Sequence, residues 1–146
     1  MSNDTETEAS SAPAPQGRYV AAVRAGGTVR TAGMTPRRNG ALTVTGKVGT
    51  DLTVAEARAA AAVAVRNALS AVRSVLPSGS SFRPVEMVVY VAAADGFTAL
   101  SAVADGASDV IAEELGLENL PARSAIGVYT LPGGAPVEIS LTATVR

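Results

Sequence analysis

Apolar and polar positions alternate along the C-terminal quarter of the chain with the two-residue period of β-strands. In residues 137–145, valine, isoleucine, leucine and alanine take every second position, and Glu138, serine and threonine stand between them. Such a strand has one core face and one polar face. Residues 120–131 alternate similarly, and the two segments predict a β-hairpin. Within it, we expect Arg123 and Glu138 to lie on the same non-core face.

Two segments have the 3.6-residue apolar period of helices that pack on a sheet. The first, residues 53–76, starts with Thr53 and Glu56 at the spacing of a capping box and is rich in alanine, which predicts close approach to the sheet. The second covers residues 98–115. It contains Gly106, which costs about 1 kcal/mol relative to alanine and therefore indicates close packing.

The remaining strands predict an α+β fold. Residues 85–92 form a nearly continuous apolar run, typical of a central strand covered on both faces. Residues 19–24 and 28–33 predict two strands joined at Gly26-Gly27, and a further short strand is expected near residues 42–45. The order is ββ(β)αβαββ, in which two helices cover one face of the sheet. The other face must meet water or another subunit.

The N-terminus is expected to lie outside this fold. Residues 1–16 are rich in serine, threonine, alanine, proline and acidic residues, which is typical of a disordered tail. Residues 17–146 then form one domain.

Composition excludes several kinds of chemistry. The 146 residues contain no histidine and no cysteine, which removes Ser-His-Asp and Cys-His catalysis, disulfides, and thiolate or imidazole metal sites. A net charge of −1 does not favour binding to nucleic acid. The chain has no apolar run of membrane-spanning length, so we expect a cytoplasmic protein that makes no use of a membrane.

Three short motifs in the last quarter point to a family. They are Pro121-Ala-Arg-Ser124, Leu131-Pro132 and Val137-Glu-Ile139, supported upstream by Gly106-Ala-Ser-Asp109. With these motifs in this order, the chain resembles the RidA/YjgF reactive intermediate deaminase family, historically called endoribonuclease L-PSP, over roughly residues 17–145. The resemblance implies a chorismate-mutase-like fold and a homotrimer with ligand sites between subunits. It also implies hydrolysis of imines or enamines of 2-amino acids to keto acids and ammonia, without cofactor or metal.

The resemblance also assigns roles to four residues. Arg123 matches the arginine that holds the carboxylate of a small-molecule substrate, and Glu138 matches the glutamate that positions or activates the hydrolytic water. Tyr19 matches a tyrosine that lines the cleft. The backbone amide of Ala125 lies where family members bind the carboxylate or leaving-group region.

Three departures from the family pattern leave other functions open. Ala32, Ser101 and Ala125 stand where archetypal deaminases have a hydroxyl residue, an asparagine and a cysteine. These changes make the predicted pocket roomier and less polar, which allows a different electrophile. They also allow a non-catalytic role as a carboxylate-binding or pathway-accessory protein. A ribonuclease is the third reading, against which the missing basic patch argues.

Overall fold

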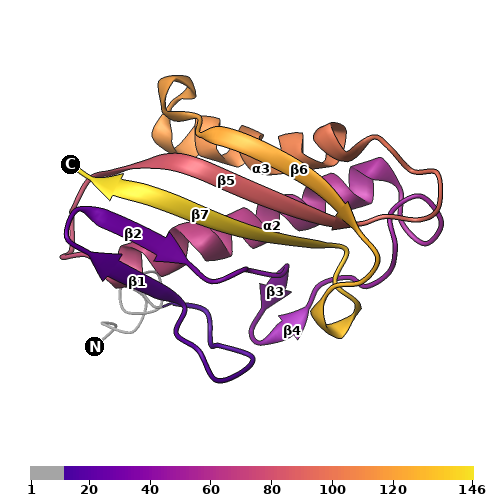
Figure 1. Cartoon of the computed structure of the whole chain (residues 1–146), viewed down its shortest axis with the longest axis horizontal. Coiled ribbons are helices and arrows are strands. Elements are labelled where there is room, and N and C mark those ends of the chain that lie inside the picture. The colour runs from indigo at the N-terminus through magenta and orange to yellow at the C-terminus, as the bar shows by residue number, and fades with distance from the viewer. Residues whose placement is uncertain (1–11) are drawn as a thin grey trace, which may run out of the picture.

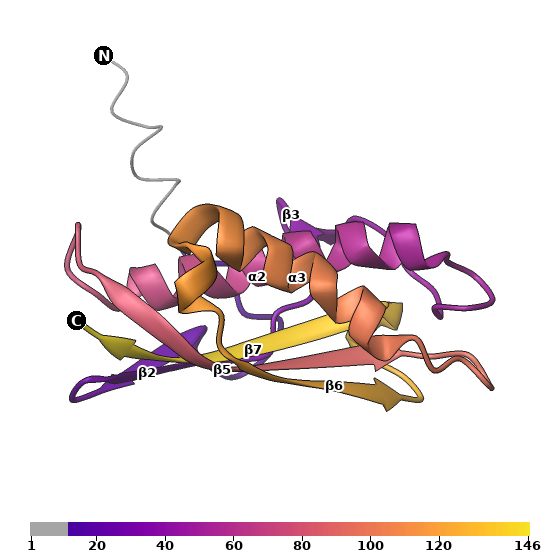
Figure 2. The same cartoon turned by 90° about the horizontal axis from the view of Figure 1, so that it is seen from above.

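The computed structural model describes residues 12–146, which form a mixed β-sheet with two helices packed on one of its faces (Figures 1 and 2). The sheet has the order β1-β2-β7-β5-β6. Its strands are β1 (Ala22–Ala25), β2 (Thr28–Thr31), β5 (Phe82–Ala92), β6 (Ala122–Val128) and β7 (Val137–Val145). The helices are α2 (Val54–Ser74) and α3 (Leu100–Leu115). The predicted α+β fold is confirmed.

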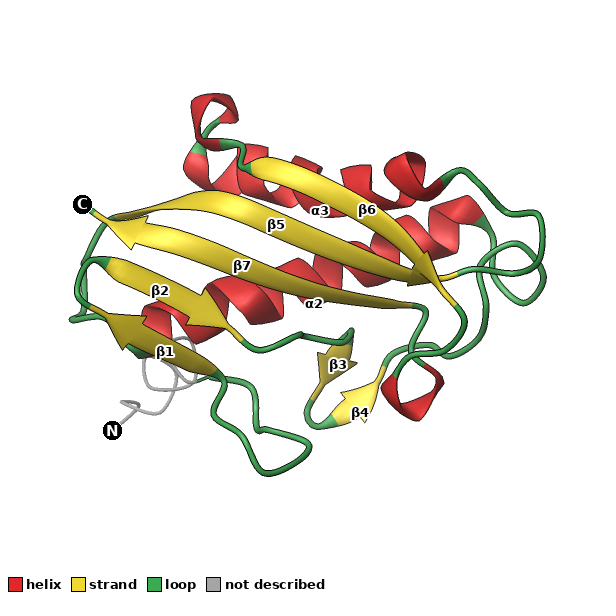
Figure 3. Cartoon of the chain, viewed as in Figure 1, coloured by secondary structure: helices red, strands yellow, loops and turns green. Residues whose placement is uncertain are grey.

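Short elements occupy the connections, as the colouring of Figure 3 shows. Two residue pairs, β3 (Arg37–Arg38) and β4 (Ala41–Leu42), make a separate antiparallel ribbon in the loop between β2 and α2. Single 3₁₀ turns, η1 (Leu117–Asn119) and η2 (Pro132–Gly134), precede and follow β6. The predicted short strand near residues 42–45 therefore exists, displaced toward the N-terminus.

Helix α2 begins where the capping pattern predicts. The backbone N–H of Glu56 donates to the hydroxyl of Thr53 at 3.2 Å, and the backbone N–H of Thr53 donates to the Glu56 carboxylate at 3.1 Å. These two bonds satisfy amide groups that a helix start otherwise leaves unpaired. Most alanines of α2 are buried, and α3 crosses it so closely at Gly106 that a Cβ atom there would lie 2.8 Å from the Cα of Arg58. The predicted close packing at Gly106 is confirmed.

Strand β5 is central, as predicted, but only one of its faces is covered. It pairs with β7 on one side and with β6 on the other, and Met87, Val89 and Val91 are fully buried beneath the helices. Val88 and Tyr90 point to the opposite face and are half-buried. The expectation of a strand covered on both faces is thus wrong for the single chain, because both helices lie on the same side of the sheet (Figure 2).

The uncovered face combines polar strand positions with exposed apolar side chains. Val23 is 56% exposed and Ile126 is 41% exposed, at positions that the strand pairing places on this face. Between them lie the serine and threonine positions of β7. Apolar side chains exposed on one face of a sheet are typical of a surface that contacts another protein.

The predicted hairpin between residues 120 and 145 is wrong. Strand β6 pairs in parallel with β5, and β5 separates it from β7 (Figure 1). The connection through η2 therefore passes over the end of β5 instead of making a tight turn between neighbours. Alternation along a strand indicates which residues share a face, and it carries no information about which strand lies next to it.

The N-terminal prediction falls mainly outside the described residues. Residues 12–16 contain no helix or strand, and Ala12 packs against the core. Within residues 12–146, no helix has the length and apolar character needed to cross a membrane.

Candidate functional site

Arg123 on β6 is held by three polar side chains of α3. Its Nη1 donates to Oδ1 of Asp105 at 2.7 Å and to the hydroxyl of Ser108 at 2.9 Å. Its Nη2 donates to the hydroxyl of Ser101 at 2.6 Å. The Arg123 side chain is only 20% exposed, so the guanidinium is fixed in one orientation. Among the residues that the structure describes, none accepts a hydrogen bond from its Nε–H, so this donor is unused within the chain.

The α3 residues lie at helical spacing on the face turned toward β6. Ser101, Asp105 and Ser108 follow one another at intervals of four and three residues, which places them in a row on one side of a helix. Sequence reasoning identified Ser101 and missed the other two. A row of polar residues on a helix whose remaining inward positions are apolar is the signal that could have found them.

Glu138 on β7 is the second charged residue of the predicted site, and it is half-buried. Partial burial raises the pKa of its carboxyl group, because a charged carboxylate loses hydration there. A Cβ atom at Gly33 would lie 2.6 Å from both the carboxyl carbon and Oε2 of Glu138. Only glycine leaves space for this side chain.

Gly33 is held against β7 by the residue that follows it. Met34 and Ile139 exchange two backbone hydrogen bonds, of 2.7 and 2.9 Å, just beyond the end of β2. This bridge fixes the loop after β2 beside Glu138.

Arg123 and Glu138 lie on opposite faces of the sheet, which corrects the prediction that they share one. Arg123 is aligned with Met87 on β5, which is fully buried under the helices. Glu138 is aligned with Tyr90, on the uncovered face. The prediction failed because Arg123 stands on an edge strand among small residues, where alternation does not distinguish the helix-facing side from the open side.

The two residues are also well separated within the sheet. Strand β5 lies between β6 and β7, so their strands are two spacings apart, roughly 10 Å. Arg123 is level with Leu141, three residues along β7 from Glu138, so the two are also offset by roughly 10 Å along the strand direction. One chain therefore does not bring Arg123 and Glu138 to the same ligand.

The other two predicted site residues, Tyr19 and Ala125, also lie far apart in the sheet. Tyr19 precedes β1, at the opposite edge of the sheet from β6, and is 46% exposed. Its hydroxyl accepts a hydrogen bond of 2.9 Å from the backbone N–H of Gln16. Ala125 is half-buried on the helix-facing side of β6, two residues from Arg123. Arg123 and Ala125 thus form one half of the predicted site, and Tyr19 and Glu138 belong to elements nearer the other edge.

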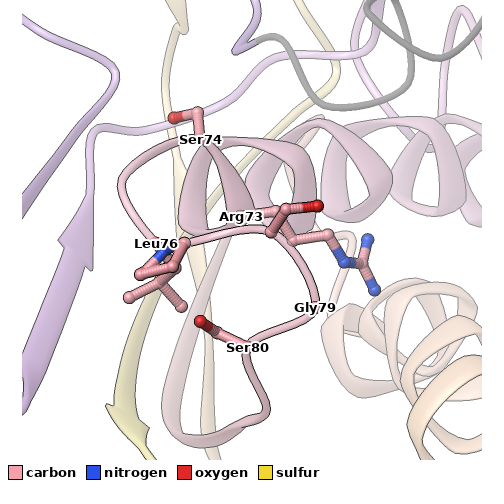
Figure 4. A pocket seen from close by; sticks show the side chains of 7 residues that line it. Arg73, Ser74, Leu76, Gly79 and Ser80 are labelled. Atoms are coloured by element: carbon pink, nitrogen blue, oxygen red, sulfur yellow. The ribbon is translucent and has the colours of Figure 1, made fainter.

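Two surface pockets of the single chain are lined by residues other than the predicted site residues. One, of about 390 Å³, lies where α2 ends, and Figure 4 shows Arg73, Ser74 and Ser80 around it. Another, of about 350 Å³, is lined in part by Lys47 and Tyr129, with Nζ of Lys47 lying 3.5 Å from the centre of the Tyr129 ring. Neither is lined by Arg123 or Glu138. Within residues 12–146, no three His, Cys, Asp or Glu side chains form a group able to hold a metal ion.

Comparisons with known proteins place the chain in a family. A family model described as Endoribonuclease L-PSP matches residues 9–145. Protein TCP17 of Trypanosoma cruzi is 37% identical over 130 residues, which cover 88% of this chain and 81% of that protein.

Two solved structures are similar in fold. Atu1372 of Agrobacterium tumefaciens, whose function is unknown, matches with a TM-score of 0.84 and 33% identity, covering 88% of this chain and 82% of that chain. TdcF of Escherichia coli, solved with bound serine, matches with a TM-score of 0.67 and 22% identity, covering 92% and 93%. At that identity, the likeness to TdcF shows the fold alone.

Proposed function

This chain belongs to the endoribonuclease L-PSP family, also called YjgF, and we propose that it hydrolyses imine or enamine derivatives of 2-amino acids to keto acids and ammonia without a cofactor. The observation that carries the proposal is the fixed guanidinium of Arg123, whose Nε–H finds no acceptor among the described residues and has the chemistry to donate to a carboxylate. The bound serine of TdcF, a protein of the same fold, supports a small carboxylate as ligand.

In this proposal Arg123 binds the substrate carboxylate. A guanidinium presents paired N–H donors whose geometry matches the two oxygens of a carboxylate. Because α3 already holds Nη1 and Nη2, little rotamer freedom is lost when the ligand binds. Ala125 lies on the same side of β6, and its backbone amide is the proposed second donor to this end of the substrate.

Glu138 is the proposed general base. It removes a proton from a water molecule whose oxygen attacks the imine carbon, so that a C–O bond forms as the C=N double bond becomes single. The nitrogen then takes up protons and leaves as ammonia while the C=O bond of the keto acid forms. The pKa of Glu138 is raised by burial, which makes its carboxylate a stronger base than a solvated glutamate. The hydroxyl of Tyr19 is the proposed orienting group on the same side.

The separation of Arg123 from Glu138 supports a site shared between two copies of the chain. We propose a homotrimer in which the open sheet face of each subunit, with Val23 and Ile126, meets its neighbours. Each of the three sites then takes Arg123 from one subunit and Glu138 from the next. A cyclic arrangement of this kind repeats one interface and closes on itself.

The test is turnover of 2-aminoacrylate generated in place by a dehydratase, followed as keto-acid formation. Wild type is expected to accelerate the reaction, and Arg123→Ala is expected to reduce kcat/KM by about 10 to 100-fold through loss of charge-assisted hydrogen bonds. Arg66→Ala is the control, because Arg66 makes only a surface ion pair of 3.5 Å with Glu114. No acceleration over buffer, with several substrate side chains tried, would contradict the proposal.

A non-catalytic carboxylate-binding protein is the second candidate, favoured by Ala32 and Ala125 where archetypal deaminases carry polar side chains. It requires that wild type binds a small carboxylate, that Arg123→Ala does not, and that no imine is turned over.

A further inference from the structure

We propose that Asp105 makes the Arg123 site select ligands that carry a cationic nitrogen beside their carboxylate over simple monoanionic carboxylates. The inference rests on the proposed function, since it takes Arg123 to be the group that binds the ligand carboxylate. It narrows the ligand class to zwitterions, such as amino acids and the protonated imines derived from them.

The charge of Arg123 is already balanced inside the protein. Oδ1 of Asp105 lies 2.7 Å from Nη1, and the other two side chains on the guanidinium, Ser101 and Ser108, are neutral. A carboxylate that binds at the Nε–H therefore meets an ion pair of net charge zero. It shares one guanidinium with the negative charge of Asp105, and the repulsion between the two carboxylates weakens binding of a simple monoanion.

The same carboxylate can accept a positive group from the ligand. Asp105 is 51% exposed, and its second oxygen, Oδ2, receives no hydrogen bond within residues 12–146. An ammonium or iminium nitrogen on the carbon next to the ligand carboxylate lies within reach of a group beside the guanidinium. Arg123 and Asp105 then complement the two charges of a zwitterion, while a monoanion satisfies only the first.

Helix α3 provides a matched control one turn further along. Asp109 likewise makes a short ion pair, of 2.8 Å, with Arg58 of α2, and it is 69% exposed. Its carboxylate has the same chemistry on the same helix and lies outside the contacts of Arg123.

The test compares L-alanine with propionate, which differ by one ammonium group, using NMR titrations of the wild-type chain near pH 7 at low ionic strength. Wild type is expected to bind L-alanine about tenfold more tightly than propionate. In Asp105→Asn, which keeps an oxygen acceptor for Arg123, affinity for propionate is expected to rise about tenfold and the preference for L-alanine to disappear. Asp109→Asn should retain the wild-type preference. Asp105→Ser provides a second uncharged variant, with the same expected reversal.

Two other outcomes contradict the inference. If both Asp105 variants keep the wild-type preference, or change both affinities by the same factor, Asp105 does not select for the cation and the proposed function stands alone. If neither ligand perturbs the resonances around Arg123 in wild type, the proposed carboxylate site fails and the inference fails with it. The inference is supported by three results together. Arg123→Ala binds neither ligand, Asp105→Asn loses the preference for L-alanine, and Asp109→Asn keeps it.

Discussion

Replacing Gly33 by alanine directs a methyl group at the carboxyl end of Glu138. The new Cβ atom would lie 2.6 Å from the carboxyl carbon and from Oε2, and 2.9 Å from Cγ. Carbon atoms in contact normally lie about 3.5 Å or more apart, so one of the two groups must move by about 1 Å.

The group that moves is the Glu138 side chain. The backbone beside Gly33 is held by the two hydrogen bonds between Met34 and Ile139, and the end of a glutamate side chain turns more easily than that bridge. A displacement of about 1 Å in a positioned base can cost roughly 100-fold in rate, so we expect kcat/KM of Gly33→Ala to fall by about 10 to 100-fold. The free energy of unfolding is expected to change by only about 1 kcal/mol.

The assay is imine hydrolysis together with thermal unfolding followed by circular dichroism. Gly27→Ala is the control, because a Cβ atom there meets nothing within 4 Å. The double variant Gly33→Ala/Glu138→Gln should be no slower than Glu138→Gln alone, since both changes act on the same group. A Gly33→Ala variant with wild-type kcat/KM, or one whose defect adds fully to that of Glu138→Gln, would refute the reasoning.

Three further predictions concern stability. Gly106→Ala drives a methyl group into the backbone of Arg58. It should lower the free energy of unfolding by about 1–3 kcal/mol, despite the better helix propensity of alanine. An unchanged melting temperature would show that α2 and α3 are not so closely packed. Thr53→Ala removes one half of the capping box and should cost about 1 kcal/mol in chemical denaturation, whereas a neutral result would mean that the cap contributes nothing. For Glu138, the raised folded-state pKa means that the folded chain binds more protons than the unfolded chain at pH values between the ordinary glutamate pKa and the raised one. Wild-type stability should therefore fall relative to Glu138→Gln as the pH rises through that interval and then level off; a difference independent of pH would contradict the cause assigned to the shift.

Local signals in the sequence predicted the elements well. The capping box at Thr53 marks the start of α2 to within one residue, and Gly116 ends α3 with a positive φ of 99°. Gly26 likewise takes a positive φ, of 60°, at the turn between β1 and β2. These signals work because they act through neighbouring residues, whose spacing is visible along the chain.

The neighbours of each strand could not be predicted in this way. The polar-apolar alternation of β7 is correct, yet β7 pairs with β2 and β5, and β6 lies beyond β5. The face of Arg123 could not be predicted either, because its small neighbours on an edge strand do not distinguish the helix-facing side from the open side. Asp105 was missed because its importance comes from a contact with a residue 18 positions away, which no local pattern reveals.

If a complete site takes Arg123 from one subunit and Glu138 from another, assemblies that mix two inactive variants restore it, and such assemblies test the shared site most directly. Arg123→Ala and Glu138→Gln chains are each expected to have little activity alone, because every site lacks one of the two groups. Co-expressed as randomly mixed trimers, they should recover about one quarter of the wild-type activity, since one combination of neighbours in four supplies both intact residues. Mixed assemblies with no more activity than the separate variants would contradict the shared site.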